Sequence, residues 1–112
     1  MTESKYPCIC CGYLVMPDFP GSYALCPICG WEDDEAQARD PFYPGGTNSL
    51  PLIRAQQEFV EHGSIDPAAG QLVRSPLPDE GRDSGWRPFD PARDVVDANR
   101  PRKARSALYY WR

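Results

Sequence analysis

The sequence of 112 residues lacks the features of several common protein classes. It has no apolar run long enough to cross a bilayer, and its start, MTESKYPC, has no signal-peptide core, so we expect a cytoplasmic protein that does not bind membranes. It has a single histidine, no G-x-S-x-G nucleophile motif and no P-loop lysine beside the Gly45-Gly46 pair. These absences predict that the protein is not an enzyme.

Positive charge is also scarce, which makes a nucleic-acid binder a less favoured class. The formal net charge is −4. The charge is uneven, because residues 32–40 contain five acids and one base, whereas residues 100–112 contain five bases and no acid. We interpret these segments as two solvated faces, with mutual attraction or binding to different partners as the alternatives.

Five cysteines are the most specific feature of the chain, and all of them lie within residues 8–31. They form two clusters, CICCGY (8–13, the first knuckle) and CPICGW (26–31, the second knuckle), that share the pattern C-x-x-C-G-aromatic. In such a turn both sulfurs face one ion, and the glycine adopts a positive φ that closes the turn. Because thiolates at this spacing bind tetrahedral Zn²⁺, the pattern predicts a metal site. Its expected ligands are Cys8, Cys11, Cys26 and Cys29.

Cys10 is the cysteine left over. When the knuckles are aligned it occupies the position of Ile28, inside the turn, so its sulfur should point away from the metal. We interpret it as a small apolar residue, with a reactive thiol as the alternative. Four cysteines already fill a zinc shell, so His62 is not expected to be a ligand, and a Cys10–His62 dyad rests on residue type alone.

The segments around the knuckles predict a hairpin and an acidic turn. Residues 12–17 (GYLVMP) and 22–27 (SYALCP) are expected to be two strands joined by a turn at Pro20-Gly21, so that the ends of the hairpin carry the knuckles. The acidic residues 32–35 are expected in a solvated turn, with the start of a short helix as the alternative, and Trp31 is expected to shield the metal site.

The segment PLIRAQQEFVEHG (51–63) predicts the main helix, because four apolar residues recur at helical spacing. Asn48 or Ser49 is expected to cap this helix and Gly63 to end it. The apolar face should pack on the knuckles. Its residues are Leu52, Ala55, Phe59 and Val60.

The C-terminal part predicts extended segments, since prolines recur from residue 67 to residue 91, with Trp86 and Phe89 as anchors. A short helix is expected from Asp90 or Pro91 to Asn99, followed by a strand over ALYYWR (107–112). This aromatic end is expected to dock into the core, with a protein interface or stacking on RNA as the alternatives.

Together these elements predict a small, metal-stapled α+β protein with a zinc-ribbon or rubredoxin-like hairpin, one main helix and a loop-rich C-terminal half. We expect a single domain over residues 1–112. Its parts are the zinc-binding hairpin (6–34), the helix with its wrapping loops (35–90), and a helix and strand tail (91–112).

These motifs resemble the bacterial cysteine-rich CPCC domain family over about residues 6–90. The specific matches are YPC (6–8), CCGY (10–13) and CPICGWEDD (26–34). Weaker matches are GSY (21–23), DP (40–41), Tyr43, GG (45–46), Asn48, Leu52, Ala55, Phe59, VRSPLPDE (73–80) and WRP (86–88). The resemblance implies a small metal-binding domain and supplies no enzymatic mechanism.

Three positions depart from the pattern of that family. Ile9 stands where the family has proline, which removes a stiffening residue from the first knuckle. Pro51 stands where members usually have a helix-capping serine, and Gln56 where they usually have arginine. We expect these two changes to affect the helix start and one surface contact, and not the metal site.

The leading hypothesis is a structural Zn²⁺ module in a protein that binds another protein of unknown identity. An immunity or antitoxin role, in which an acidic face covers a toxin, is one form of this hypothesis. A rubredoxin-like protein that transfers electrons through Fe is the first alternative, because the ligands alone do not separate iron from zinc. An RNA-binding zinc ribbon with a basic tail is the second.

Overall fold

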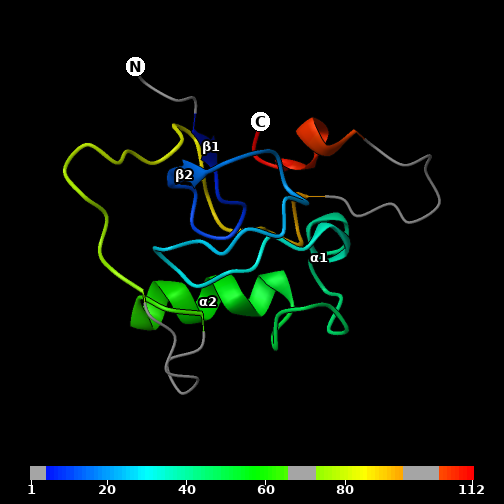
Figure 1. Ribbon diagram of the computed structural model, residues 1–112. Coiled ribbons are helices and arrows are strands. Elements are labelled where there is room, and N and C mark those ends of the chain that lie inside the picture. Colours follow the sequence, from blue (N-terminus) through cyan, green and yellow to red (C-terminus); the bar gives the residue numbers. More distant parts are fainter. Residues whose placement is uncertain (1–4, 66–72, 95–103) are drawn as a thin grey trace.

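The computed structural model describes residues 5–65, 73–94 and 104–112. Its elements confirm a small α+β fold. They are strands β1 (Tyr6–Pro7) and β2 (Leu14–Met16), helices α1 (Glu35–Arg39) and α2 (Leu52–His62), and the 3₁₀ helix η2 (Arg105–Leu108) (Figure 1). Within these described ranges, every helix is too short or too polar to pass through a bilayer.

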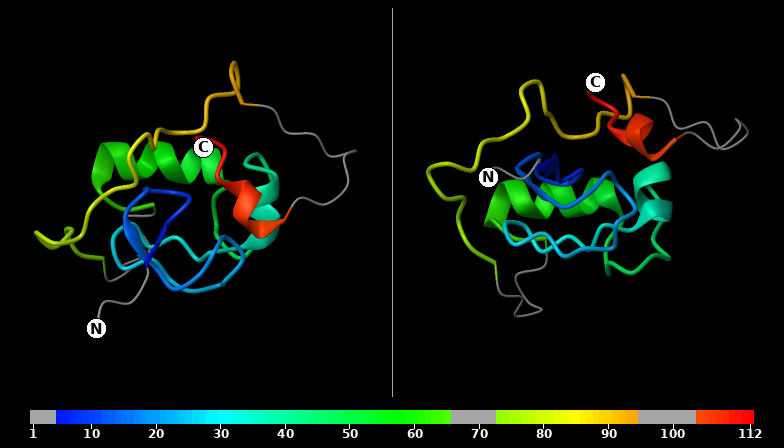
Figure 2. Two further views of the ribbon diagram at one scale, coloured as in Figure 1. Left: turned by 90° about the horizontal axis from the view of Figure 1, so that it is seen from above. Right: turned by 45° about the horizontal axis from the view of Figure 1, so that its top comes forward.

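The cysteine-bearing loops lie at the centre of the fold. α2 runs along one side of them, and η2 lies beside α1 in both views of Figure 2. The core contains all five cysteines together with large apolar side chains from the knuckles and from α2. These include Ile9, Ile28, Trp31 and Leu52. The cysteines are therefore part of the main hydrophobic core.

The hairpin is present, but it closes around the first knuckle and does not link the two knuckles. β2 pairs with β1 in an antiparallel ladder that places Tyr6 opposite Met16. The predicted return strand, residues 22–27, instead forms the isolated bridge Leu25↔Glu32 across the second knuckle. Each knuckle is thus the tip of its own short ladder, because a turn that aligns two sulfurs also brings its own flanking residues together.

The acidic run does form a short helix, which corrects the expectation of a solvated turn. Asp34 is the N-cap of α1, and its Oδ1 accepts a hydrogen bond from the Gln37 backbone N–H at 3.1 Å. Asp33 and Asp34 are only 2% and 4% exposed. These two carboxylates therefore belong to the interior, and the acidic segment offers less charged surface than its sequence suggests.

α2 matches the predicted main helix in its bounds but not in its cap. Pro51 is the N-cap and no side chain caps the helix, while Gly63 ends it in the left-handed conformation at φ +77°. Asn48 does not cap α2, because its side chain binds the second knuckle. Leu52 and Ala55 are buried as expected, whereas Val60 is 65% exposed.

The C-terminal tail docks into the core without forming the predicted strand. Residues 105–108 form η2 and the following residues turn, so that neighbouring rings pack against each other. Tyr109 is 3% exposed, and its hydroxyl donates a hydrogen bond to the Pro7 carbonyl at 2.9 Å. Core docking, the leading expectation for this end, is confirmed. Of the predicted short helix, residues 91–93 form a turn, and residues 95–99 lie outside the described residues.

Candidate metal centre

The two knuckles have the same internal hydrogen bonds, which confirms the alignment of their sequences. In the first, the Cys8 N–H donates to the Tyr13 carbonyl at 2.9 Å and the Gly12 N–H donates to the Cys8 carbonyl at 2.7 Å. In the second, the corresponding bonds join Cys26 to Trp31 at 2.8 Å and Gly30 to Cys26 at 3.0 Å. Both glycines have positive φ, +81° at Gly12 and +90° at Gly30, as the closing turn requires.

These turns bring four sulfurs together from the two knuckles. The sulfurs of Cys8 and Cys29 lie 3.8 Å apart, as do those of Cys11 and Cys26, and all four lie within 4.8 Å of one another. A tetrahedron with zinc–sulfur bonds of about 2.3 Å has edges of about 3.8 Å. The spacing therefore fits a single four-coordinate ion, and these side chains could hold one.

Burial disfavours thiolates in this cluster unless a cation lies between them. All four side chains are fully buried. Burial raises the pKa of the Cys8 and Cys29 thiols well above the ordinary value, because a thiolate loses its hydration there. Hydrogen bonds from the neighbouring thiols, chiefly that of Cys11, lower the pKa of Cys26. Only a positive ion at the centre would stabilise four thiolates at once.

Cys10 is not one of these four, but its side chain hydrogen-bonds with that of Cys29, so it does not point away from the cluster as predicted. It is fully buried in the core, and the metal-compatible set among the described residues contains only the other cysteines. His62 also lies apart from them, at the end of α2, where its Nε2 is 3.5 Å from Glu58. The structure therefore gives no support to a Cys10–His62 dyad.

The first knuckle is covered by a strap that we define as residues 81–91. The Asp83 N–H donates to the Gly12 carbonyl at 2.7 Å, and the Arg82 Nε donates to the Cys11 carbonyl at 2.8 Å. The Arg82 guanidinium lies 4.5 Å from the ring centroids of both Tyr13 and Trp86. Trp86 packs so closely on Gly12 that a Cβ there would lie 2.4 Å from the ring.

Gln56 joins this strap to the first knuckle from inside the protein. It is 1% exposed, and its Nε2 donates to the Ile9 carbonyl at 3.1 Å and to the Tyr110 hydroxyl at 2.7 Å. Its Oε1 accepts from the Phe89 N–H at 2.9 Å. The expectation that Gln56 makes a surface contact is therefore wrong, because its side chain is buried and links three segments.

The second knuckle is held by the loop between α1 and α2. The Asn48 side chain pairs with the backbone of Glu32, accepting from its N–H and donating to its carbonyl, both at 2.8 Å. Asn48 also donates to Gln37 Oε1 at 2.8 Å. The Gln37 Nε2 in turn donates to the carbonyls of Tyr43 and Leu50. A chain of amides thus fixes the loop against the residues that follow Trp31.

Trp31, which the sequence predicts to shield the centre, lies in the core next to Cys29. Its side chain is fully buried, and its backbone N–H points at the Cys29 sulfur at 3.4 Å. Such an N–H group offsets thiolate charge. Further backbone bonds join the second knuckle to later segments, from Ile65 to the Cys29 carbonyl and from Arg74 to the Pro27 carbonyl, both at 3.0 Å.

Sequence reasoning missed three buried polar residues that support the centre. Gln37, Asn48 and Gln56 are each less than 8% exposed and fully engaged in hydrogen bonds. One signal was available for Gln56, because it lies four residues after Leu52 and three before Phe59, on the inward side of α2. A polar residue on an apolar helix face indicates a buried hydrogen-bond partner.

The fold and the site define a small cysteine-cluster domain, built from two metal-compatible knuckles. The chain belongs to the cysteine-rich CPCC family, whose family model matches residues 6–80. This match confirms the resemblance seen in the sequence, although it ends before Trp86-Arg87-Pro88, so the likeness there stays a prediction. No curated protein was found to match the chain.

Proposed function

We propose that Cys8, Cys11, Cys26 and Cys29 bind one Zn²⁺ ion that stabilises the fold. The tetrahedral spacing of four buried sulfurs carries this proposal. When bound, the ion supplies the positive charge that the buried thiolates need. The Trp31 N–H, the knuckle glycines and the strap hold the sulfurs in place around it.

A closed site of this kind favours a structural role over catalysis. Catalytic zinc sites keep one position for water or substrate, whereas four cysteines leave none. The proposed function is therefore that of a metal-stabilised binding module and not of an enzyme.

Elemental analysis of protein purified without added metal tests the identity of the ion. The expected result is one zinc per chain in a colourless protein. A red protein that contains iron, with visible thiolate-to-iron absorption, would replace this proposal with the electron-transfer alternative. A folded protein without any metal would contradict both.

For the binding role, the proposal places a protein partner on the outer side of the second knuckle. Tyr23 and Leu25 are 51% and 59% exposed, next to the buried Cys26. Tyr23 has φ +60°, a strained conformation for a residue with a Cβ. The bond from its N–H to the Asp33 carbonyl at 3.0 Å holds it there. Strain that presents an exposed aromatic ring supports a recognition role.

A pulldown from the native host, with purified protein as bait, tests this role. Leu25→Asp should lose the captured protein, whereas Val60→Asp should keep it, since Val60 is 65% exposed on α2. Equal capture by both variants would remove the second knuckle from the proposal.

The two more specific roles receive less support from the structure. An immunity-type acidic face would have to do without Asp33 and Asp34, which are buried. An RNA-binding tail would have to use residues other than Arg105, whose guanidinium bonds to the Phe19 and Pro20 carbonyls and lies 3.1 Å from Asp18. Arg100, Arg102 and Lys103 lie outside the described residues.

A further inference from the structure

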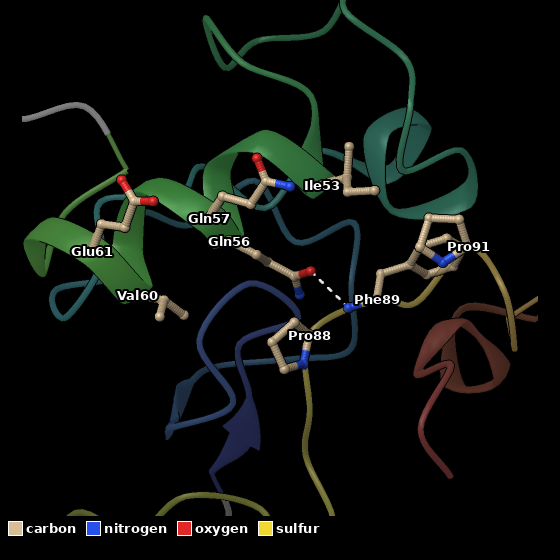
Figure 3. Close-up of a pocket in the computed structure, with 8 residues that line it drawn as sticks. All are labelled: Ile53, Gln56, Gln57, Val60, Glu61, Pro88, Phe89 and Pro91. Carbon is tan, nitrogen blue, oxygen red and sulfur yellow. Dashed lines mark hydrogen bonds between the residues drawn. The ribbon is translucent and has the colours of Figure 1, made fainter.

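α2 and the strap line an open groove of about 350 Å³ (Figure 3). Ile53 and Val60 line it from the helix, and the rings of Pro88, Phe89 and Pro91 form the opposite wall. Val60 is 65% exposed at its edge. The groove is thus an apolar surface of α2 that the rest of the described chain leaves open.

The wall opposite α2 is held in place by side-chain bonds. Arg87 and Asp94 form a bidentate ion pair with two bonds of 2.7 Å, which closes the segment that carries Pro88, Phe89 and Pro91. Phe89 is also fixed by its N–H bond to Gln56, drawn in Figure 3. A partner could therefore bind this groove without first ordering it.

The apolar surface continues beyond the groove. The exposed ring of Phe42 packs edge-to-face on Phe89, with the ring centroids 5.8 Å apart, and extends the patch past the Ile53 end of α2. A contiguous exposed apolar patch with a charged rim is typical of a protein–protein interface.

Charges on α2 are arranged so that the patch complements itself. Arg54 lies beside Ile53 at the N-terminal end of the helix, and Glu61 lies beside Val60 at the C-terminal end. Both charged side chains are mostly exposed, at 57% and 68%, and their contacts within the chain are long, 3.5 Å from Arg54 to Glu58 and 3.6 Å from Glu61 to His62. Ile53 and Val60 are seven residues apart, and so are Arg54 and Glu61. An apolar stripe and a charged stripe therefore run side by side along α2. Turning a second α2 antiparallel would bring Arg54 near Glu61 and Val60 near Ile53.

We propose that this groove binds a second copy of the chain, with the two α2 helices antiparallel across a twofold axis near Gln57. Val60 of each copy enters the groove of the other, and Arg54 of each copy pairs with Glu61 of the other. A twofold interface must be self-complementary, and a helix that is basic at one end and acidic at the other meets this condition. This inference concerns a different face from the second knuckle and does not depend on the identity of the metal or the partner.

Sedimentation velocity of the metal-loaded protein, from about 1 µM to about 1 mM, tests self-association. The wild-type protein should shift from monomer to dimer within this range, because the groove is small. Val60→Glu should raise the dissociation constant at least about tenfold. Leu77→Glu, a matched control at an exposed apolar residue outside the groove, should leave it unchanged. Circular dichroism of each variant confirms that it is folded.

A charge-reversal series then tests the orientation of the helices. Arg54→Glu and Glu61→Arg should each weaken the dimer several-fold, and the double variant should recover most of the wild-type affinity, since opposite charges then face each other again. If the single variants merely damaged the monomer, the double variant would not recover the affinity. A wild-type protein that stays monomeric up to about 1 mM, leaving the groove to a foreign partner, overturns the proposal. A dimer that Val60→Glu does not weaken, or that the double variant does not restore, overturns it equally.

Discussion

The two knuckles share one sequence pattern and one set of internal hydrogen bonds, but different parts of the chain cover them. The first knuckle is covered by the strap and the aromatic tail, which follow the family-matched residues 6–80. The second is held by Asn48 and Gln37, which lie within that region. The cysteine motif therefore sets the geometry of the sulfurs, whereas the cover is supplied separately for each knuckle.

Exposure follows the same division. Around the first knuckle, Trp86 and Tyr109 close the surface, while beside the second knuckle Tyr23 and Leu25 remain exposed. Later segments thus cover the surface over the first knuckle, whereas apolar side chains beside the second knuckle stay exposed although its cysteines are buried. Four sets of experiments can separate the contribution of the shared centre from that of each cover.

The largest effect is expected from Cys26→Ser, which would remove one of the four proposed metal ligands. Both knuckles should then lose their structure together, whatever covers them. Metal binding at such sites is worth about 10–16 kcal/mol, as much as the whole stability of a domain. Both knuckles should unfold, as seen by circular dichroism and by loss of bound metal. Cys10→Ala, at a buried cysteine outside the four, should keep both the metal and the fold. A native spectrum for Cys26→Ser without metal would refute the shared centre.

A smaller effect, confined to the cover of the first knuckle, is expected from Gly12→Ala. The new Cβ would meet the Trp86 ring at 2.4 Å in addition to the strain of φ +81°, so the free energy of unfolding should fall by about 2–4 kcal/mol. Gly85→Ala is the matched control, because Gly85 has φ +86° but open space around it, and it should lose only about 1 kcal/mol. Chemical denaturation measures both values, and equal losses would show that Trp86 does not press on Gly12.

The buried amides should separate the two covers from each other. Gln56→Ala would leave the Ile9 carbonyl and the Phe89 N–H without their partner, at a cost of about 1–3 kcal/mol. Gln37→Ala should cost a similar amount around the loop that holds Asn48. Hydrogen exchange should show faster opening near the strap in the first variant and near residues 43–50 in the second. Faster exchange at both places in each variant would mean that the covers are coupled.

The smallest expected effect is on the pH dependence of stability, which should have opposite signs for a carboxyl group beside the first knuckle and one beside the second. Hydrogen bonds from Arg112 and Trp111 lower the pKa of Asp83 beside the first knuckle, so its contribution to stability is present above the unfolded pKa and is lost as the pH falls through the folded one. Burial raises the pKa of Asp33 beside the second knuckle, so its contribution is present at low pH and is lost as the pH rises through the folded pKa.

Acidification from neutral pH should therefore weaken the stabilising contribution of Asp83 in the strap. It should also remove the destabilising buried charge of Asp33 by protonating it. Denaturation of the metal-loaded protein over the carboxylate range checks this expectation. Asp33→Asn should raise stability near neutral pH by a fraction of a kcal/mol and flatten the curve, whereas Asp83→Asn should lower it. The same sign for both variants would contradict the assigned causes.

The features that the sequence predicts well are the local ones. A repeated C-x-x-C-G pattern closes its own turn, so the four ligand candidates, both positive-φ glycines and the end of α2 at Gly63 follow from neighbouring residues. The partner of β2 could not be predicted in this way. Pairing with β1 or with residues 22–27 satisfies the same alternation of side chains, and only the closure of each knuckle decides between them.

The features that could not be predicted from the sequence depend on long-range contacts. The links made by Gln56 join residues 47 and 33 positions away in the sequence, and nothing near it in the chain identifies those partners. The aromatic tail has the composition of a strand, but its rings find partners on Phe19 and Phe89, so packing overrides β-propensity. Core and surface near the knuckles are therefore decided by segments distant in sequence.

The aromatic tail also has an optical consequence. The rings of Tyr109 and Tyr110 each lie 5.0 Å from the ring of Trp111, so light absorbed by these tyrosines should pass to the indole and leave little tyrosine emission. Detachment of the tail would break the hydrogen bond from Trp111 Nε1 to Asp83 (2.7 Å) and expose the indole to water, which should shift its emission to longer wavelength. The intrinsic fluorescence of the chain can thus report, without a label, whether the first knuckle is covered.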